Sequence, residues 1–183
     1  MRFLLSIVTA SAALLLVSAA PEHVGAASPC EGEVPSPLAV PAGNELAFAA
    51  DAVGAQVYVC TAGAGAFSWV FQAPEAKLSD PGGPAVGTHY AGPTWESTDG
   101  SKVVGAKVEA ATPDATAIPW LLLRAASHAG DGRMAEVTFV QRIRTSGGNP
   151  PTGGCDAAHA GAVSRVPYRA VYCFYRKVAG ARG

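Results

Sequence analysis

The chain has 183 residues, of which 15% are charged, and its formal net charge is −1. This balance lacks the strongly basic character of a nucleic-acid-binding protein, so we expect no nucleic-acid partner. A mature chain of about 155 residues is enough for one domain with its own hydrophobic core.

The N-terminus has the pattern of a secretory signal peptide. Arg2 precedes an apolar run from Phe3 to Val17, which is shorter than the roughly 20 residues that a membrane-spanning helix needs. Small residues between Ala19 and Ala27 offer cleavage sites. We therefore assign residues 1–27 to a signal peptide, expect no membrane span, and predict an exported protein, either periplasmic or extracellular.

The cysteines point to an oxidising compartment. An even number of cysteines in an exported chain favours disulfide bonds, and four cysteines allow three pairings. A zinc site would need close pairs such as Cys-x-x-Cys, which this chain lacks. We expect disulfides and no metal ion or other cofactor. The four cysteines are Cys30, Cys60, Cys155 and Cys173.

Charge is distributed unevenly along the chain. From Pro21 to Pro119 there are 11 acidic and three basic residues, whereas from Trp120 onward there are three acidic and nine basic residues. The preferred interpretation is that strands from the two halves pair, so that opposite charges meet on the surface. The alternative is an anion-binding patch formed by the C-terminal arginines.

The alternation of apolar and polar residues predicts β-strands connected by short turns. Residues 28–45 are rich in proline and predict an extended arm, and residues 46–178 predict a single domain. About eight to ten short strands and no long amphipathic helix indicate an all-β fold, an antiparallel β-sandwich or barrel stabilised by disulfides. The clearest predicted strands are Val53–Val59, Phe67–Gln72, Ala85–Tyr90, Lys102–Ala110, Trp120–Leu123, Val137–Arg144 and Tyr168–Lys177.

Two local patterns refine this prediction. Asp99-Gly100 lies between Thr94-Trp95-Glu96 and the strand from Lys102, which predicts a hairpin closed by a tight turn. Between Val137 and Arg144, an apolar face alternates with a face that carries Arg142, and we expect that second face to be solvated or functional. The segment Ser146–Ala162 predicts a long loop.

Several segments in a fixed order resemble one known family. They include GAQVYVC, FSWVFQAPEAKL, GTHYAGP, GPTWESTDGSKVVG, IPWLLLRA and QRIRTSGG. The chain from Leu38 to Tyr175 resembles domain-of-unknown-function family 3455 of secreted microbial proteins, which implies an exported single domain and no established activity. Two cysteines match positions within the family's motifs and two look like additions. The resemblance therefore favours the pairs Cys60–Cys155 and Cys30–Cys173.

The candidate site is the polar and aromatic stretch from His89 to Gly105. Flat rings offer a surface for a sugar or another small molecule, and charged groups, Arg142 among them, would fix its orientation. Trp69 and Trp120 lie in apolar patterns and are expected in the core, whereas Trp95 is the best candidate to line a cleft. The predicted ligand-binding residues are Trp95, Glu96, His89, Asp99 and Tyr90, and the predicted partner is a small molecule, a glycan or an envelope component.

The alternative function is a hydrolytic or metal-dependent enzyme that uses His89, Glu96 and Asp99. One histidine and two carboxylates suit an oxygen-preferring divalent ion, but their spacing gives weak support. The chain has no G-x-S-x-G or H-E-x-x-H motif, and Cys155 beside His159 is better explained by a disulfide than by a catalytic dyad. Catalysis would require His89 and a carboxylate to converge in one pocket.

Overall fold

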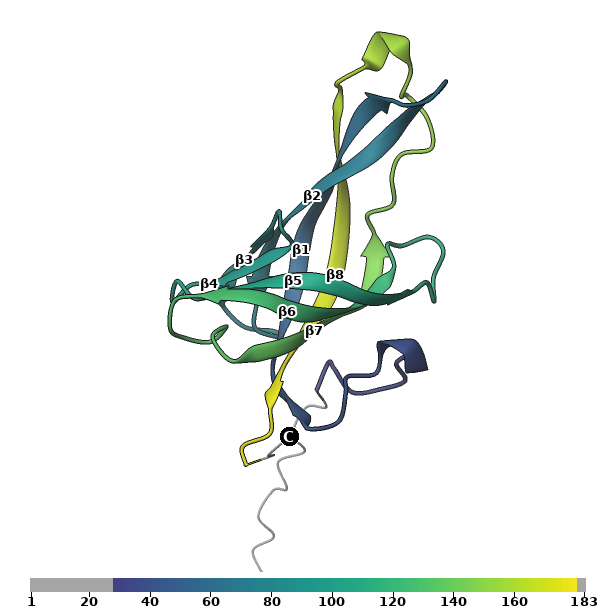
Figure 1. Cartoon of the computed structure of the whole chain (residues 1–183). Coiled ribbons are helices and arrows are strands. Elements are labelled where there is room, and N and C mark those ends of the chain that lie inside the picture. Colours follow the sequence, from purple (N-terminus) through teal and green to yellow (C-terminus); the bar gives the residue numbers. More distant parts are fainter. Residues whose placement is uncertain (1–27, 181–183) are drawn as a thin grey trace, which may run out of the picture.

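The computed structural model describes residues 28–180, which form a closed antiparallel β-barrel (Figure 1). The predicted all-β fold is confirmed, and of the two architectures considered the barrel is the one present. The predicted signal peptide, residues 1–27, lies outside the described residues. The strands are β1 (Asn44–Ala62), β2 (Phe67–Ser79), β3 (Ala85–Tyr90), β4 (Thr94–Ser97), β5 (Lys102–Ala111), β6 (Trp120–Ala129), β7 (Val137–Gly147) and β8 (Val163–Lys177).

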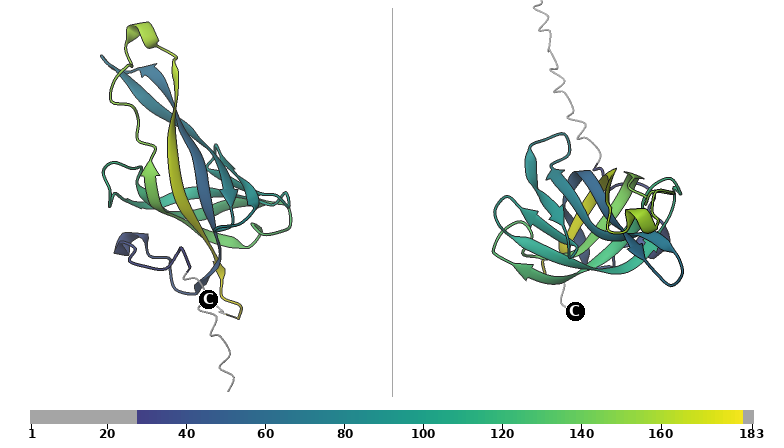
Figure 2. Two further views of the ribbon diagram at one scale, coloured as in Figure 1. Left: turned by 180° about the vertical axis from the view of Figure 1, so that it is seen from behind. Right: turned by 90° about the horizontal axis from the view of Figure 1, so that it is seen from above.

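The strands follow one another around the barrel in chain order. Each strand pairs with the next one, and β8 pairs with β1 to close the sheet. Seen from above, the strands surround one axis (Figure 2). The predicted hairpin is present as β4 and β5, and Gly100 in its turn has a φ of 87°. Closure leaves the barrel wall without an unpaired edge.

Three strands are longer than the others and leave the ring. The lengths of β1, β2 and β8 are 19, 13 and 15 residues, and their far ends form a twisted arm above the barrel (Figure 1). We call this part the three-stranded extension. The loop between β7 and β8 runs beside it and contains the 3-10 turn η2 (Ala157–His159).

The main core fills the barrel, with β8 providing its inner face. Tyr168, Ala170, Tyr172 and Phe174 alternate along β8 and are all buried in this core. The ring of Phe174 stacks on Phe48 of β1 at a centroid distance of 4.4 Å. Alternating inward positions of a strand are what a closed barrel buries.

A second, smaller core lies on the outside of the wall. The Cys30–Cys173 disulfide packs with Val171 and Ile143, and Trp120 packs against this group. Nearby, the 3-10 turn η1 (Ser36–Leu38) contacts β5 and β6, and Leu38 is completely buried. The proline-rich segment is therefore folded against the barrel rather than simply extended.

The faces of β7 differ from the simple alternation of its sequence. A β-bulge between Val137 and Phe139 shifts the register, so that Val137 and Val140 both belong to the inner core. Arg142 pairs directly with Tyr172, a residue of the inner core, and faces the same side. Gln141 faces outward, where its Nε2 donates to the carbonyl of Leu38 at 2.6 Å. At Arg142, the face expected to be solvated or functional is thus the inside of the barrel, whereas Arg144 lies within a second irregularity of the strand, is exposed and donates to the carbonyl of Glu31.

Three ion pairs support the preferred interpretation of the charge distribution. C-terminal arginines meet acids of the first half at N–O distances of 2.7 to 3.0 Å. Such exposed pairs contribute little to stability individually. The pairs are Arg133–Asp80, Arg165–Glu75 and Arg176–Glu45.

Both disulfides have the pairing that the family resemblance favoured, Cys30–Cys173 and Cys60–Cys155. They are consistent with a protein exported to an oxidising compartment. Within residues 28–180, no helix is long and apolar enough to cross a membrane.

We predict that replacing Cys30 and Cys173 together by alanine lowers the free energy of unfolding by about 2–5 kcal/mol, because the bridge constrains the unfolded chain. The bridge joins residues 143 positions apart. Urea denaturation measures the loss, and limited proteolysis should show new cleavage between residues 31 and 43. The Cys60→Ala/Cys155→Ala variant is the control and should leave that segment protected. An unchanged denaturation midpoint in the first variant would contradict the prediction.

Candidate functional site

The barrel contains a cavity of about 320 Å³ at the end where β3 turns into β4. Its volume falls at the small end of the range of ligand pockets. Phe71, at 48% exposure, is the most solvent-accessible large apolar residue of its lining. The apolar part of the lining consists of Phe71, Pro74, Pro93, Leu121 and Leu123.

A stacked pair of rings forms one side of the cavity. His89 on β3 and Trp95 on β4 are directly opposite in the register, and their rings stack at 4.5 Å with an interplanar angle of 11°. Tyr172 of β8 meets both rings edge-on, at 5.0 Å from His89 and 5.4 Å from Trp95. Three strands therefore fix this aromatic group.

The imidazole of His89 is neutral. Its Nδ1 donates a hydrogen bond to the carbonyl of Thr94 at 2.9 Å, which places the ring proton on that nitrogen. Burial lowers the pKa of His89 to about 3, and the positive charge of Arg142 acts in the same direction. At neutral pH, Nε2 is therefore an unprotonated hydrogen-bond acceptor.

Gly105 on β5 makes room for the indole ring. A Cβ atom at this position would lie 2.8 Å from Cζ3 of Trp95 and 3.1 Å from Cδ2 of Leu123. A side chain here would overlap the indole unless the ring shifted. Glycine is therefore a steric requirement of the site rather than a turn residue.

Arg142 brings the positive charge to the cavity. Its Nε and Nη2 both donate to the carbonyl of Pro119, at 3.0 and 2.8 Å. The register places Arg142 opposite Leu121 and Tyr172, which also line the cavity. The hydroxyl of Tyr172 lies 3.4 Å from that of Tyr168, and burial raises the pKa of both phenols.

Two buried donors have no hydrogen-bond partner among the described residues. They are Nε1 of Trp95 and Nε2 of Gln56. Trp95 lines the cavity, and Gln56 pairs in the register with Pro74, which also lines it. Unsatisfied buried donors are rare, because leaving one without an acceptor costs about 1–3 kcal/mol.

The other predicted site residues lie elsewhere. Glu96 follows Trp95 on β4 and points to the outer face, where its Oε2 accepts from the Tyr90 hydroxyl at 2.7 Å and pairs with Lys102 Nζ at 3.1 Å. The hydrogen bond from Tyr90 is the main cause that lowers the pKa of Glu96. Tyr90 and Glu96 thus share a partly exposed cluster on the other side of the wall from His89.

Asp99 organises the β4–β5 turn. Its carboxylate accepts from the amide of Ser101 at 2.9 Å, from the Ser101 hydroxyl at 2.6 Å, and from the amide of Arg133 at 2.8 Å. These bonds, the one from Arg133 first, hold the pKa of Asp99 far below its usual range. Asp99 lies at the opposite end of the barrel from the β3–β4 turn and does not reach the cavity.

The structure thus separates the three residues of the enzymatic alternative. His89 faces the inside, Glu96 the outside, and Asp99 the far end. Within residues 28–180, no group of three or more His, Cys, Asp or Glu side chains is placed to hold a metal ion. The convergence of His89 with a carboxylate, which catalysis would require, is not found among the described cavity residues.

The tryptophans depart partly from expectation. The prediction that Trp69 lies in the core is wrong: it is only partly buried on the three-stranded extension, where Nε1 donates to Gly153 at 2.9 Å. The extension leaves the ring, so no opposite wall covers its strands. Trp120 is partly buried against the outer core, and Trp95, at 1% exposure, is a core residue that also lines the cavity.

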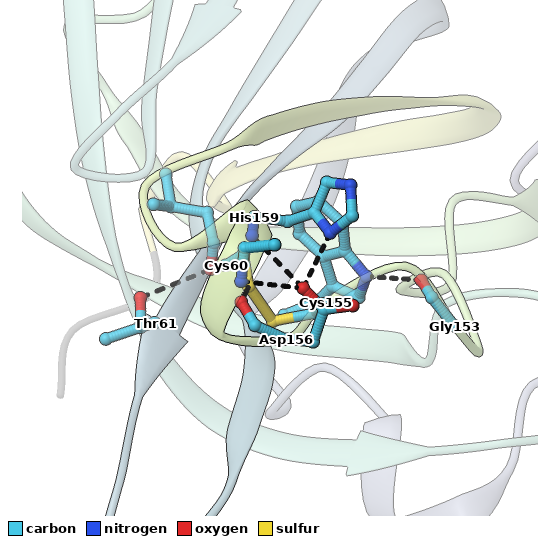
Figure 3. The surroundings of a disulfide bond; sticks show 9 residues. Cys60, Thr61, Gly153, Cys155, Asp156 and His159 are labelled. Atoms are coloured by element: carbon cyan, nitrogen blue, oxygen red, sulfur yellow. Dashed lines mark hydrogen bonds and ion pairs between the residues drawn. A yellow bond between two sulfur atoms is a disulfide. The ribbon is translucent and has the colours of Figure 1, made fainter.

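The second disulfide fastens the long loop to the three-stranded extension (Figure 3). Cys60 is bonded to Cys155, and beside it the carboxylate of Asp156 accepts from two amides of η2 and lies 2.6 Å from Nδ1 of His159. Cys155 therefore carries no thiol beside His159. Its role is to order a loop that has no core of its own.

A protein-family model described as "Protein of unknown function (DUF3455)" matches residues 41–85 and 81–176. The chain belongs to this family. The resemblance found in the sequence motifs is thereby confirmed, and DUF3455 carries no activity to transfer. Neither the curated proteins nor the solved structures contain a match to the chain.

Sequence reasoning found part of the DUF3455 cavity. It singled out His89, Trp95 and Arg142, which line one cavity, but it missed Tyr172 and Leu121. The strand alternation of β6 and β8 was visible, yet only barrel closure shows that their inward faces meet Trp95.

We predict that Gly105→Ala lowers stability by about 1–3 kcal/mol, because the new methyl group would overlap the indole of Trp95, which is packed against His89, Tyr172 and Phe174. Gly153→Ala is the matched control. No atom lies within 4 Å of the added Cβ there, so its effect should stay within about 0.5 kcal/mol. Urea denaturation compares the two variants, and equal stabilities would contradict the steric role of Gly105.

We predict that burial of neutral His89 makes the protein sensitive to acid. The unfolded chain takes up a proton near pH 6.5, whereas the folded protein resists protonation down to about pH 3, so stability falls as the pH drops through this interval. Between pH 7 and pH 4 the wild type should lose about 3 kcal/mol more than His89→Gln. Denaturation at both pH values measures this difference, and parallel losses in the two proteins would refute it.

Proposed function

We propose that this DUF3455 protein binds a small molecule inside its barrel after export. The observation that carries the proposal is the cavity at the β3–β4 end, in which an apolar lining surrounds a few inward polar groups. This combination is typical of ligand sites in the mouths of β-barrels. The polar side chains of the lining are those of Gln72, His89, Trp95, Arg142 and Tyr172.

The character of the lining favours a small, largely apolar molecule over a glycan. Glycan sites present exposed aromatic faces together with polar side chains for the sugar hydroxyls. Here the stacked face of Trp95 is covered by His89, and its exposure is 1%. The apolar side chains of Leu121 and Leu123 would contact the ligand instead.

The geometry also supports binding over catalysis. His89 is held neutral and packed against Trp95, and its nearest polar contact is the backbone of Thr94. The described lining of the cavity includes no carboxylate, serine or free thiol to act with it. Its groups are those that orient a ligand.

We predict that the neutral fluorescent probe N-phenyl-1-naphthylamine binds to the wild-type barrel and that Leu121→Trp weakens binding at least tenfold. The larger side chain would fill the cavity that Leu121 lines. Fluorescence titration measures the affinity, since emission of the probe rises in an apolar site.

Val108→Trp is the matched control. Val108 lies on β5 with 47% exposure and does not line the cavity, so this variant should bind as the wild type does. The proposal fails when the wild type does not bind the probe, or when both variants bind it equally well.

A further inference from the structure

We infer that the ligand of the barrel is an organic anion, a small apolar molecule that carries a carboxylate. This inference rests on the proposed function and specifies the chemistry of its ligand. Three observations support it: a cation without a counter-ion, a buried indole N–H without an acceptor, and an apolar remainder of the lining.

Arg142 differs from the surface arginines because it lines the cavity. On the surface, Arg133, Arg165 and Arg176 each pair with a carboxylate, whereas the exposed Arg124, Arg144 and Arg169 form no ion pair within residues 28–180. Arg142 also forms no ion pair within residues 28–180; its guanidinium donates two hydrogen bonds to the carbonyl of Pro119. Of the five N–H donors of a guanidinium, two are used there.

A partly buried cation attracts an anion more strongly than an exposed one, because less water screens the interaction. His89 adds no second charge, since its imidazole is neutral. Arg142 is therefore the single cation of the described lining, and no acidic side chain of that lining opposes it. The planar guanidinium matches the geometry of a carboxylate.

A buried donor of the lining points to the same chemistry. Nε1 of Trp95, a lining residue, has no hydrogen-bond partner among the described residues, and it is an N–H group. What it lacks is an acceptor oxygen, and a carboxylate provides acceptors only. A cationic or donor-rich ligand would leave it unsatisfied.

The apolar part of the cavity indicates that the rest of the ligand is apolar. Leu121, Leu123 and Phe71 line it from β6 and β2, on strands other than that of Arg142. An anion with an apolar tail would bury that tail against these side chains while its head reaches the guanidinium. Inorganic anions would not use this surface.

The direct test compares octanoate with octanamide, which have the same chain and differ in the charge of the head group. Isothermal titration of the wild-type protein should give at least tenfold tighter binding of octanoate at neutral pH. Equal affinities, or tighter binding of octanamide, would overturn the inference.

Arg142→Met tests the residue itself and should reduce the affinity for octanoate at least tenfold while leaving that for octanamide within about twofold. Arg142→Lys keeps the charge and should retain a preference for octanoate. Arg124→Met, on an exposed position of β6, is the control that should change neither affinity. Unchanged octanoate binding by Arg142→Met would overturn the inference. Because that variant also loses the bonds to Pro119, the comparison of ligands on the wild type stands independently of it.

A structural readout comes from the three tryptophan indole N–H signals in ¹⁵N NMR spectra. Octanoate should shift the signal of Trp95 and leave that of Trp69, which already donates to Gly153, nearly unchanged. A Trp95 signal that does not respond to bound octanoate would count against the inference.

When N-phenyl-1-naphthylamine binds but octanoate and octanamide bind with equal affinity, only the anion inference fails. When the neutral probe does not bind either, the proposed function fails with it.

Discussion

The pairing of β1 with β8 is the constraint on which the rest of the structure depends. It runs from Asn44 opposite Lys177 to Val59 opposite Val163 and turns an open meander into a closed wall. Once the wall is closed, every inward side chain meets side chains from across the barrel. Phe48 and Phe174 stack because β1 and β8 pair. The cavity remains because side chains do not completely fill one end of the barrel.

Closure also explains how polar groups come to lie inside. An interior arginine is costly unless its donors are satisfied, and here the carbonyl of Pro119 holds the guanidinium at the start of β6. His89 avoids the cost of a buried charge because its imidazole is neutral, and its Nδ1 donates to the carbonyl of Thr94. The cavity therefore combines one cation, Arg142, with the neutral acceptor of His89 and the indole N–H of Trp95, which has no partner within residues 28–180.

The two disulfides attach different segments to the barrel and its extension. Cys30–Cys173 attaches the N-terminal segment to the outer face of the wall, where it creates a second core with Ile143 and Val171. Cys60–Cys155 secures the long loop beside the three-stranded extension. Neither bridge crosses the barrel interior, so the cavity depends on strand pairing and side-chain packing rather than on a covalent link.

By itself, the sequence indicated a part of most strands, the Asp99-Gly100 turn, the all-β fold and the even set of cysteines, because these depend on local alternation, turn chemistry and composition. It also pointed to His89, Trp95 and Arg142 as residues of interest. It did not give the full length of β1, β2, β6 and β8. Only the tertiary structure decided which side chains of each strand point into the barrel. A bulge in β7 reversed the faces around Arg142, and adjacent positions on β4 separated Trp95 from Glu96. Since a strand sends neighbouring side chains to opposite faces, closeness in sequence cannot show which of them share a site; closure of the barrel does.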